Sequence, residues 1–191
     1  MNLCIFCGSR SGGSPAYAAA TRRLGRLIGE GGHGLVYGGG HVGLMGVLAD
    51  AVLGAGGPVV GVIPEALVRL EVGHRSLSEQ HVVPDMHARK RLMAERADAF
   101  VALPGGIGTL EELYEVWTWR QLGYHDKPVG LLNVEGFYTR LLGFMDYTVA
   151  EGFLDPAQRA TLLVDDDPER LLQGLMSAAP GSAAVDDYSR I

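Results

Sequence analysis

Lysine is scarce in this chain. Only two of its 16 basic residues, Lys90 and Lys127, are lysines. A Walker-type phosphate loop needs a glycine, then a lysine, then a serine or threonine. Lys90 instead follows Arg89, and Lys127 follows Asp126. The sequence therefore excludes a P-loop nucleoside triphosphatase.

Positive net charge and long apolar runs are also missing. The formal net charge is −6, so no overall basic field exists to bind nucleic acid. No apolar run approaches the ~18 residues of a transmembrane helix, and we expect no membrane span. No charged leader precedes the first apolar run, residues 2–7, and from this we expect a cytoplasmic protein.

Cysteine occurs only twice, at Cys4 and Cys7. Both lie in run 2–7, which predicts a buried strand, and residues three apart on a strand point to opposite faces. The two thiols cannot then share a metal ion or form a disulfide without distortion. We predict two small buried hydrophobic side chains instead.

Glycine, by contrast, is abundant, with 28 in 191 residues, about twice the usual ~7%. The glycines follow short, continuously apolar runs that are typical of parallel strands covered on both faces. A longer helical stretch follows each of these glycine loops. The expected strands are 2–7, 34–38, 58–63, 98–103, 128–132 and 161–164, and the expected helices are 15–30, 43–56, 85–96, 108–122, 136–151 and 168–178.

This alternation predicts an α/β fold, a single Rossmann-like domain with a doubly wound parallel sheet. We place the domain at residues 1–178 and a flexible acidic tail at 179–191. Residues 64–84 form a long connection, and connections of this length inside a compact domain are usually functional or bound to a partner.

Three glycine-rich loops follow expected strands, at residues 8–13, 38–43 and 104–109. The carboxyl ends of parallel strands are where such sheets bind ligands, and helix N-termini there favour anions. The second loop reads G-x-G-x-x-G, a pattern of dinucleotide-binding proteins. It follows the second strand rather than the first, and the next strand ends in Ile63-Pro64 without an acidic residue for a ribose. These departures disfavour NAD(P).

The third loop carries the strongest signal. It combines Pro104, three glycines and Thr109, and Glu112 lies one helical turn after Gly108. A simple helix cap explains Thr109 and one glutamate. It does not explain three glycines, so phosphate binding by this loop is the alternative that we favour.

Residues 104–112 match the P-G-G-x-G-T-x-x-E signature of the LOG ("lonely guy") family, and residues 86–90 resemble its M-H-x-R-K segment. The resemblance extends over residues 1–165. Members of this family are cytokinin riboside 5′-monophosphate phosphoribohydrolases. The resemblance implies hydrolysis of N6-substituted adenosine 5′-monophosphates, or of AMP, to free base and ribose 5-phosphate, without a cofactor. It also implies a homodimer with helices 85–96 and 108–122 near the interface.

By resemblance, Arg89 and Glu112 are the catalytic pair. A carboxylate stabilises the positive charge that develops on ribose and orients or deprotonates the attacking water. Arg89 would hold the phosphate or a ribose hydroxyl, or keep Glu112 ionised. Without the resemblance, Arg89 beside Lys90 would indicate a solvated charged face. The expected substrate contacts are Gly8, Ser9, Gly39, Gly40, Met45, Glu71, Met86, Lys90, Pro104, Gly105, Gly106, Gly108, Thr109, Glu111 and Thr118.

Other functions stay open on the sequence. A non-catalytic carrier of a nucleotide or phosphorylated cofactor fits the same loops. The label "lysine decarboxylase", also used for this family, implies pyridoxal phosphate on a lysine, and we expect neither Lys90 nor Lys127 to be buried enough. The six histidines show no close metal-ligand spacing, so we expect no metal. His41, in the second glycine loop, is either a ligand contact or a surface residue.

Overall fold

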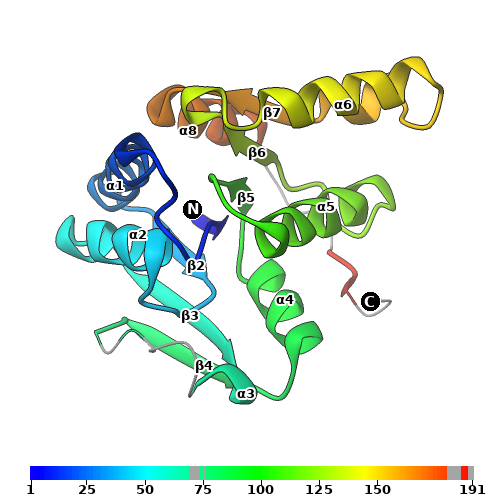
Figure 1. The fold of residues 1–191 in the computed structure, drawn as a ribbon. Helices are drawn as coiled ribbons and strands as arrows, with labels where there is room; N and C mark the ends of the chain where they lie inside the picture. Colours follow the sequence, from blue (N-terminus) through cyan, green and yellow to red (C-terminus); the bar gives the residue numbers. More distant parts are fainter. Residues whose placement is uncertain (69–73, 75, 180–185, 189–191) are drawn as a thin grey trace.

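The computed structural model describes residues 1–68, 74, 76–179 and 186–188. Within these residues seven strands form one sheet in the order β4-β3-β2-β1-β5-β6-β7 (Figure 1), and every pair of neighbours is parallel. The predicted Rossmann-like single domain is confirmed. The strands are β1 (Asn2–Phe6), β2 (Gly34–Tyr37), β3 (Val59–Pro64), β4 (Glu79–Val83), β5 (Ala99–Ala102), β6 (Val129–Leu132) and β7 (Leu162–Asp165).

Helices cover both faces of the sheet, with α1 and α2 on one side and α4 and α5 on the other (Figure 1). None of the helices in the described residues is long and apolar enough to cross a membrane. The helices are α1 (Pro15–Glu30), α2 (Gly43–Gly54), α3 (Glu65–Val68), α4 (Met86–Glu95), α5 (Ile107–Gln121), α6 (Thr139–Ala150), α7 (Pro156–Ala160) and α8 (Pro168–Ala178), with a 3-10 turn at Val134–Gly136.

The first strand divides its side chains between two cores. Leu3 and Ile5 pack with α1 and α2, whereas Cys4 and Phe6 pack with α4 and α5. Cys7 belongs to the first core and Cys4 to the second, and both thiols are free and buried. The prediction of two buried thiols on opposite faces is confirmed. Burial is the main cause that raises the pKa of both thiols well above its usual value.

The connection 64–84 is not a plain loop, because it contains α3 and the edge strand β4. The side chains of Glu79, Gln80 and Val82 are exposed, so this strand carries no apolar signal. Its backbone pairs with β3 from Val60–Glu79 to Pro64–Val83, and Ser78 Oγ accepts a hydrogen bond of 3.0 Å from the Val59 amide. Backbone pairing at an edge needs no apolar side chains, which is why the sequence pattern missed β4.

Helix starts follow the sequence signals in part. Ser14 caps α1 and Asp167 caps α8, each directly before a proline. Helix α5, however, begins at Ile107 with Gly106 as its N-cap and no side-chain cap. Thr109 is therefore not the cap that a simple capping motif would require. The expected helix 136–151 also begins later, at Thr139, because Glu135 and Gly136 have positive φ angles.

Part of the expected tail 179–191 lies against the domain; residues 180–185 and 189–191 are outside the described residues. Tyr188 is buried and packs on Trp119 and His125. Asp186 pairs with Lys127 at 2.6 Å. Lys127 is buried, against expectation, and its Nζ also donates to the Ala94 carbonyl oxygen at 2.9 Å.

His125 lies beneath this contact as a buried neutral imidazole. Its Nε2 is 2.9 Å from the Val116 carbonyl oxygen, to which it donates, and its Nδ1 accepts from the Lys127 amide at 3.2 Å. Burial is the largest cause that lowers the pKa of His125, to about 4. The folded protein thus resists protonation of this ring at pH values where the unfolded chain binds the proton.

We predict that the free energy of unfolding decreases as the pH falls from 6.5 to 4. In this interval the unfolded state binds more protons at position 125 than the folded state, so stability rises with pH. The full effect is at most about 3 kcal/mol. Chemical denaturation of the wild type and His125→Asn at several pH values measures it, and the variant should show a flatter pH dependence. His87→Gln, a change at an exposed histidine, should leave the wild-type slope; equal slopes in all three would contradict the prediction.

Candidate active site

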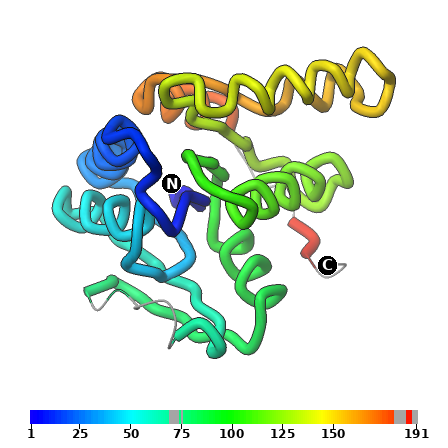
Figure 2. Tube along the Cα trace, in the orientation of Figure 1, coloured from blue at the N-terminus to red at the C-terminus, as the bar shows by residue number. Residues whose placement is uncertain are grey.

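Three loops at the carboxyl ends of β1, β2 and β5 pack directly on one another. The Gly8 amide donates to the Pro104 carbonyl oxygen at 3.0 Å, and the Leu44 amide donates to the Gly8 carbonyl oxygen at 3.0 Å. The first loop thus lies between the other two. Figure 2 shows the loops after β1 (blue) and β5 (green) beside each other at the centre of the molecule. These hydrogen bonds fix one shared rim at this edge of the sheet.

The glycines of the rim have two different roles. Gly43 has a φ of 59°, and a Cβ on it would overlap the backbone of Ser9 and Arg10. A Cβ on Gly105 would overlap the Thr109 side chain. A Cβ on Gly106 or Gly108, in contrast, would meet no protein atom within 4 Å among the described residues. The last two glycines leave open space that a ligand can use.

That space is a cavity of about 340 Å³, within the size range of small-molecule sites. It lies where β1, β2 and α2, α4 and the start of α5 meet. The residues that line it are Ile5, Cys7, Gly8, Ser9, Gly38, Met45, Leu67, Met86, Arg89, Met93, Gly106, Ile107, Gly108, Thr109, Glu111 and Glu112. A second cavity of about 490 Å³ shares Gly8, Ser9, Gly106 and Ile107 and adds the aromatic rings of Tyr17 and Phe137.

Arg89 forms one wall of the first cavity. It lies on α4, whose start is capped by Asp85, and only 5% of its surface is exposed. Its Nη2 donates to the Gly38 carbonyl oxygen at 3.1 Å, and its Nη1 is 3.7 Å from Met86 Sδ. Its Nε has no hydrogen-bond partner among the described residues. Arg89 therefore does not belong to a solvated face; it is a buried cation with a donor still to be satisfied.

Gly38 makes this position of Arg89 possible. A Cβ on Gly38 would overlap the Arg89 guanidinium. The first glycine of the G-x-G-x-x-G pattern serves a tight turn in dinucleotide-binding proteins. Here it also makes room for a side chain of this protein. The contact therefore ties the second glycine loop to α4.

Glu112 lies on α5, half-buried, and lines the same cavity as Arg89. After burial, the charge of Glu112 is the next cause that raises the pKa of the Cys7 thiol in the cavity wall. The Arg89 charge acts in the opposite direction on the pKa of Cys4. A carboxylate and a guanidinium from two different helices thus face one small space.

Most of the other expected contacts border one of the two cavities. Thr109 is buried in the first turn of α5, and Met45 lies in the first core. Met86 and Ile107 stand at the rim, 40% and 89% exposed. Ile107 and Leu67 were not expected, although Ile107 occupies the variable position of the signature. Expected residues that line the first cavity are Gly8, Ser9, Met45, Met86, Gly106, Gly108, Thr109 and Glu111, and Pro104 and Gly105 line the second.

Four expected contacts line neither cavity. Gly39 has a φ of 77° and faces β3, and Gly40 follows it, also buried. Lys90 pairs with Glu111, itself in the lining of the first cavity, at 2.6 Å and with Glu115 at 2.8 Å. Thr118 is exposed ten residues along α5 from Gly108. Glu71 lies outside the described residues, so its contact with substrate stays a prediction.

Comparison with known proteins matches residues 45–175 to a family model described as "Possible lysine decarboxylase". A protein of Oryza sativa subsp. japonica named "Probable cytokinin riboside 5′-monophosphate phosphoribohydrolase LOG4" is 51% identical over 93% of this chain and 77% of its own length. The Arabidopsis thaliana protein "Cytokinin riboside 5′-monophosphate phosphoribohydrolase LOG1" is 48% identical over 93% of this chain and 84% of its own.

Solved structures show the same fold at lower identity. The molybdenum cofactor carrier protein of Chlamydomonas reinhardtii superimposes with a TM-score of 0.70 at 20% identity, over 93% of this chain and 96% of that one. The molybdenum cofactor binding protein of Rippkaea orientalis gives 0.69 at 22% identity, over 92% and 95%. At such identities the likeness extends to the fold alone.

We predict that Gly38→Ala impairs the site while sparing the fold. The new methyl group displaces the end of a buried side chain, so we expect the free energy of unfolding to fall by about 1–3 kcal/mol while the protein still folds. The displaced guanidinium no longer borders the cavity correctly, and a displacement of ~1 Å costs ~100-fold in rate. Thermal denaturation and turnover of a nucleoside 5′-monophosphate measure the two effects.

Gly54→Ala is the matched control, because a Cβ there meets nothing within 4 Å and Gly54 ends α2 away from the first cavity. It should leave turnover unchanged. Normal turnover in Gly38→Ala would show that the Gly38–Arg89 contact does not position the guanidinium.

Proposed function

This chain belongs to the LOG family of cytokinin riboside 5′-monophosphate phosphoribohydrolases, and we propose that its cavity lined by Arg89 and Glu112 is the hydrolytic site. The enzyme cleaves the N-glycosidic bond of an N6-substituted adenosine 5′-monophosphate and releases free base and ribose 5-phosphate. The observation that carries the site assignment is that α4 and α5 bring one buried cation and one carboxylate to the same space beside open glycines.

The start of α5 is the proposed phosphate site. Its N-cap is Gly106, which provides no side-chain cap, so amides of the first turn remain available to an anion. The 15-residue helix adds a partial positive charge at this end. Gly106 and Gly108 allow close approach because neither has a Cβ in the cavity.

With the phosphate there, Glu112 is close enough in the same cavity to act on the ribose. As the C1′–N9 bond breaks, its electron pair leaves with the purine and positive charge develops on the ribose ring. The Glu112 carboxylate stabilises this charge and accepts a proton from the water that attacks C1′. Arg89 donates a hydrogen bond from Nε to the substrate, either to the phosphate or to a ribose hydroxyl. Its positive charge also balances the negative charge of Glu112.

Three methionines offer a place for the purine substituent. Met45, Met86 and Met93 line the cavity on the side of α2 and α4. Unbranched, polarisable side chains adapt to ligands of varied shape. Because an extra methylene group in an apolar pocket changes selectivity by only ~1–3 kcal/mol, we expect plain AMP to be a slower substrate rather than a non-substrate.

The description "Possible lysine decarboxylase" does not fit the two lysines of this chain. A decarboxylase of this kind needs a lysine amine in the cavity to hold pyridoxal phosphate. Lys127 is buried, but its amine is held by Ala94 and Asp186. Lys90 is held by Glu111 and Glu115. Neither lines the cavity.

The reaction is tested by incubating the protein with N6-isopentenyladenosine monophosphate and with AMP and separating the products. We expect free base and ribose 5-phosphate from both. Glu112→Gln should lower turnover at least ~100-fold while nucleotide affinity stays within a few-fold. Arg89→Ala should impair both affinity and turnover.

Glu115→Gln serves as the control for Glu112→Gln, since Glu115 lies on the same helix but does not line the cavity. Its turnover should match the wild type. Unchanged turnover in Glu112→Gln would remove that carboxylate from the mechanism. Binding of both nucleotides without cleavage would instead indicate a nucleotide carrier on this fold.

We also propose that the enzyme is a homodimer with α4 and α5 near the interface. Met86 and Ile107 are apolar side chains exposed at the rim of the cavity. A second chain packed against them would complete the wall of the site. Light scattering on the purified protein should give about twice the chain mass of 20.3 kDa. A mass near 20.3 kDa across micromolar concentrations would contradict this. A cytoplasmic location stays a prediction.

A further inference from the structure

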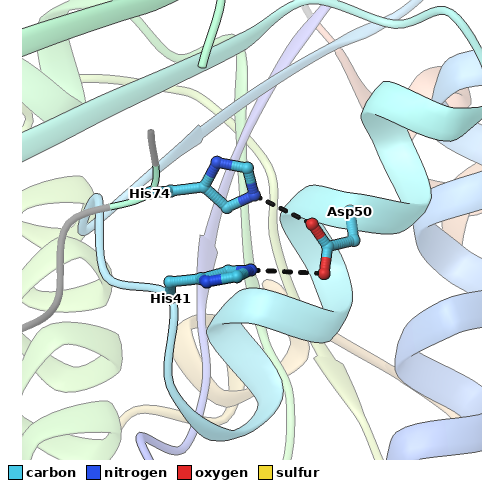
Figure 3. Close-up of side chains that lie close together, drawn as sticks. All are labelled: His41, Asp50 and His74. Carbon is cyan, nitrogen blue, oxygen red and sulfur yellow. Dashed lines mark hydrogen bonds and ion pairs between the residues drawn. The ribbon is translucent and has the colours of Figure 1, made fainter. Parts of the chain in front are cut away.

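A second cluster of histidine and carboxylate side chains lies outside the cavity. It comprises His41 from the loop between β2 and α2, Asp50 from α2, and His74 from the segment before β4 (Figure 3). His74 Nε2 is 2.9 Å from Asp50 Oδ1, and His41 Nε2 is 3.4 Å from Asp50 Oδ2. The two imidazole rings meet edge to face with centroids 4.4 Å apart. Both rings thus present Nε2 to one carboxylate.

These atoms are spaced as metal ligands are. One ligand atom from each residue lies within 4.8 Å of the other two. Two ligands on a tetrahedral zinc ion, each bound at 2.0–2.2 Å, are roughly 3.3–3.5 Å apart. The 3.4 Å between His41 and Asp50 falls within this range, and the 2.9 Å between His74 and Asp50 is about 0.4 Å shorter. Small side-chain rotations therefore suffice to place an ion between the three groups.

The chemical types and the exposure also suit an ion. Two imidazoles and one carboxylate are ligands for zinc and its neighbours in the first transition series rather than for Ca²⁺ or Mg²⁺. The His74 side chain is 5% exposed, whereas those of His41 and Asp50 are 44% and 60% exposed. The buried ring of His74 would bind the ion from the interior. Coordination positions on the solvent side would remain for water molecules.

In the ion-free cluster, a ring proton of His74 occupies the position that a metal ion would take. The Ser76 amide donates to His74 Nδ1 at 3.2 Å, so the ring proton is on Nε2 and points to Asp50. An ion takes the place of that proton. The ring proton then moves to Nδ1, and the hydrogen bond from Ser76 is lost, which costs on the order of 1 kcal/mol. The His74 amide, which donates to the Gly39 carbonyl oxygen at 3.2 Å, still holds the residue in place.

We propose that His41, Asp50 and His74 form a binding site for a divalent transition-metal ion such as Zn²⁺. The ion links the second glycine loop, α2 and the segment before β4. His41 follows two residues after Gly39, and Asp50 lies five residues after Met45. Met45 and Gly38 border the catalytic cavity. The site is separate from Arg89 and Glu112, and its role is to fasten the chain beside the active site.

Isothermal titration of dialysed protein with ZnCl₂ tests the proposal without any substrate. We expect saturable binding of one ion per chain and a rise in Tm on adding Zn²⁺, with no rise on adding Mg²⁺ or Ca²⁺. His41→Ala should weaken binding at least about tenfold, because loss of even an outer-shell partner has an effect of that size. The His41 side chain is 44% exposed, so its removal should lower the Tm of the metal-free protein by only about 2–4 °C.

His81→Ala is the matched control. His81 Nε2 lies 2.6 Å from Glu79 on β4, so it too is a histidine beside a carboxylate. Within the residues that the structure describes, no third ligand joins this pair. It should bind Zn²⁺ as the wild type does. The proposal is overturned if the wild type shows no saturable binding, or if His41→Ala binds as tightly as the wild type. Neither result would affect nucleotide hydrolysis, which Glu112→Gln tests separately.

Discussion

The packing of Gly8 between two other loops is the constraint on which the site depends. Its amide and its carbonyl oxygen each hold a neighbouring loop at 3.0 Å. A side chain on Gly8 would press on Arg10 and on the loop after β5. Backbone contacts of this kind tolerate little error because Pro104 follows a strand of the sheet and Leu44 lies in the first turn of α2. The open space at Gly106 and Gly108 exists because the other glycines bring the loops so close.

Sequence patterns predicted the sheet well wherever burial determines the residues. Strands β1, β2, β3, β5 and β6 are covered on both faces and are apolar apart from Asn2, and their positions agree with the expected runs. The pattern failed at β4, where pairing with β3 stabilises a strand with exposed polar side chains. It also failed at Lys127, because a burial that depends on Asp186 and Tyr188 leaves no local signal.

In the site, too, local sequence motifs were predictive and long-range contacts were not. The signature at residues 104–112 and the segment at 86–90 identified Arg89 and Glu112, which the fold brings to one cavity. The burial of Arg89 depends on Gly38, 51 residues earlier, and no local pattern expresses such a contact. His41, Asp50 and His74 are separated by nine and 24 residues, so the absence of a short histidine motif led to the expectation of no metal. Tertiary structure alone assembles both groups.

The position of Arg89 also bears on why this fold hydrolyses rather than merely carries a nucleotide. A buried guanidinium whose Nε finds no partner in the described part of the chain is costly in the free protein. A carrier could bind phosphate through the start of α5 and the glycines alone, without this cost. The cost is reduced when a substrate group accepts the hydrogen bond, and the Glu112 carboxylate in the same cavity opposes the charge. An arrangement that holds opposite charges ready before the bond breaks stabilises a transition state more than a ground state. This supports the proposal that the buried cation belongs to the catalytic apparatus.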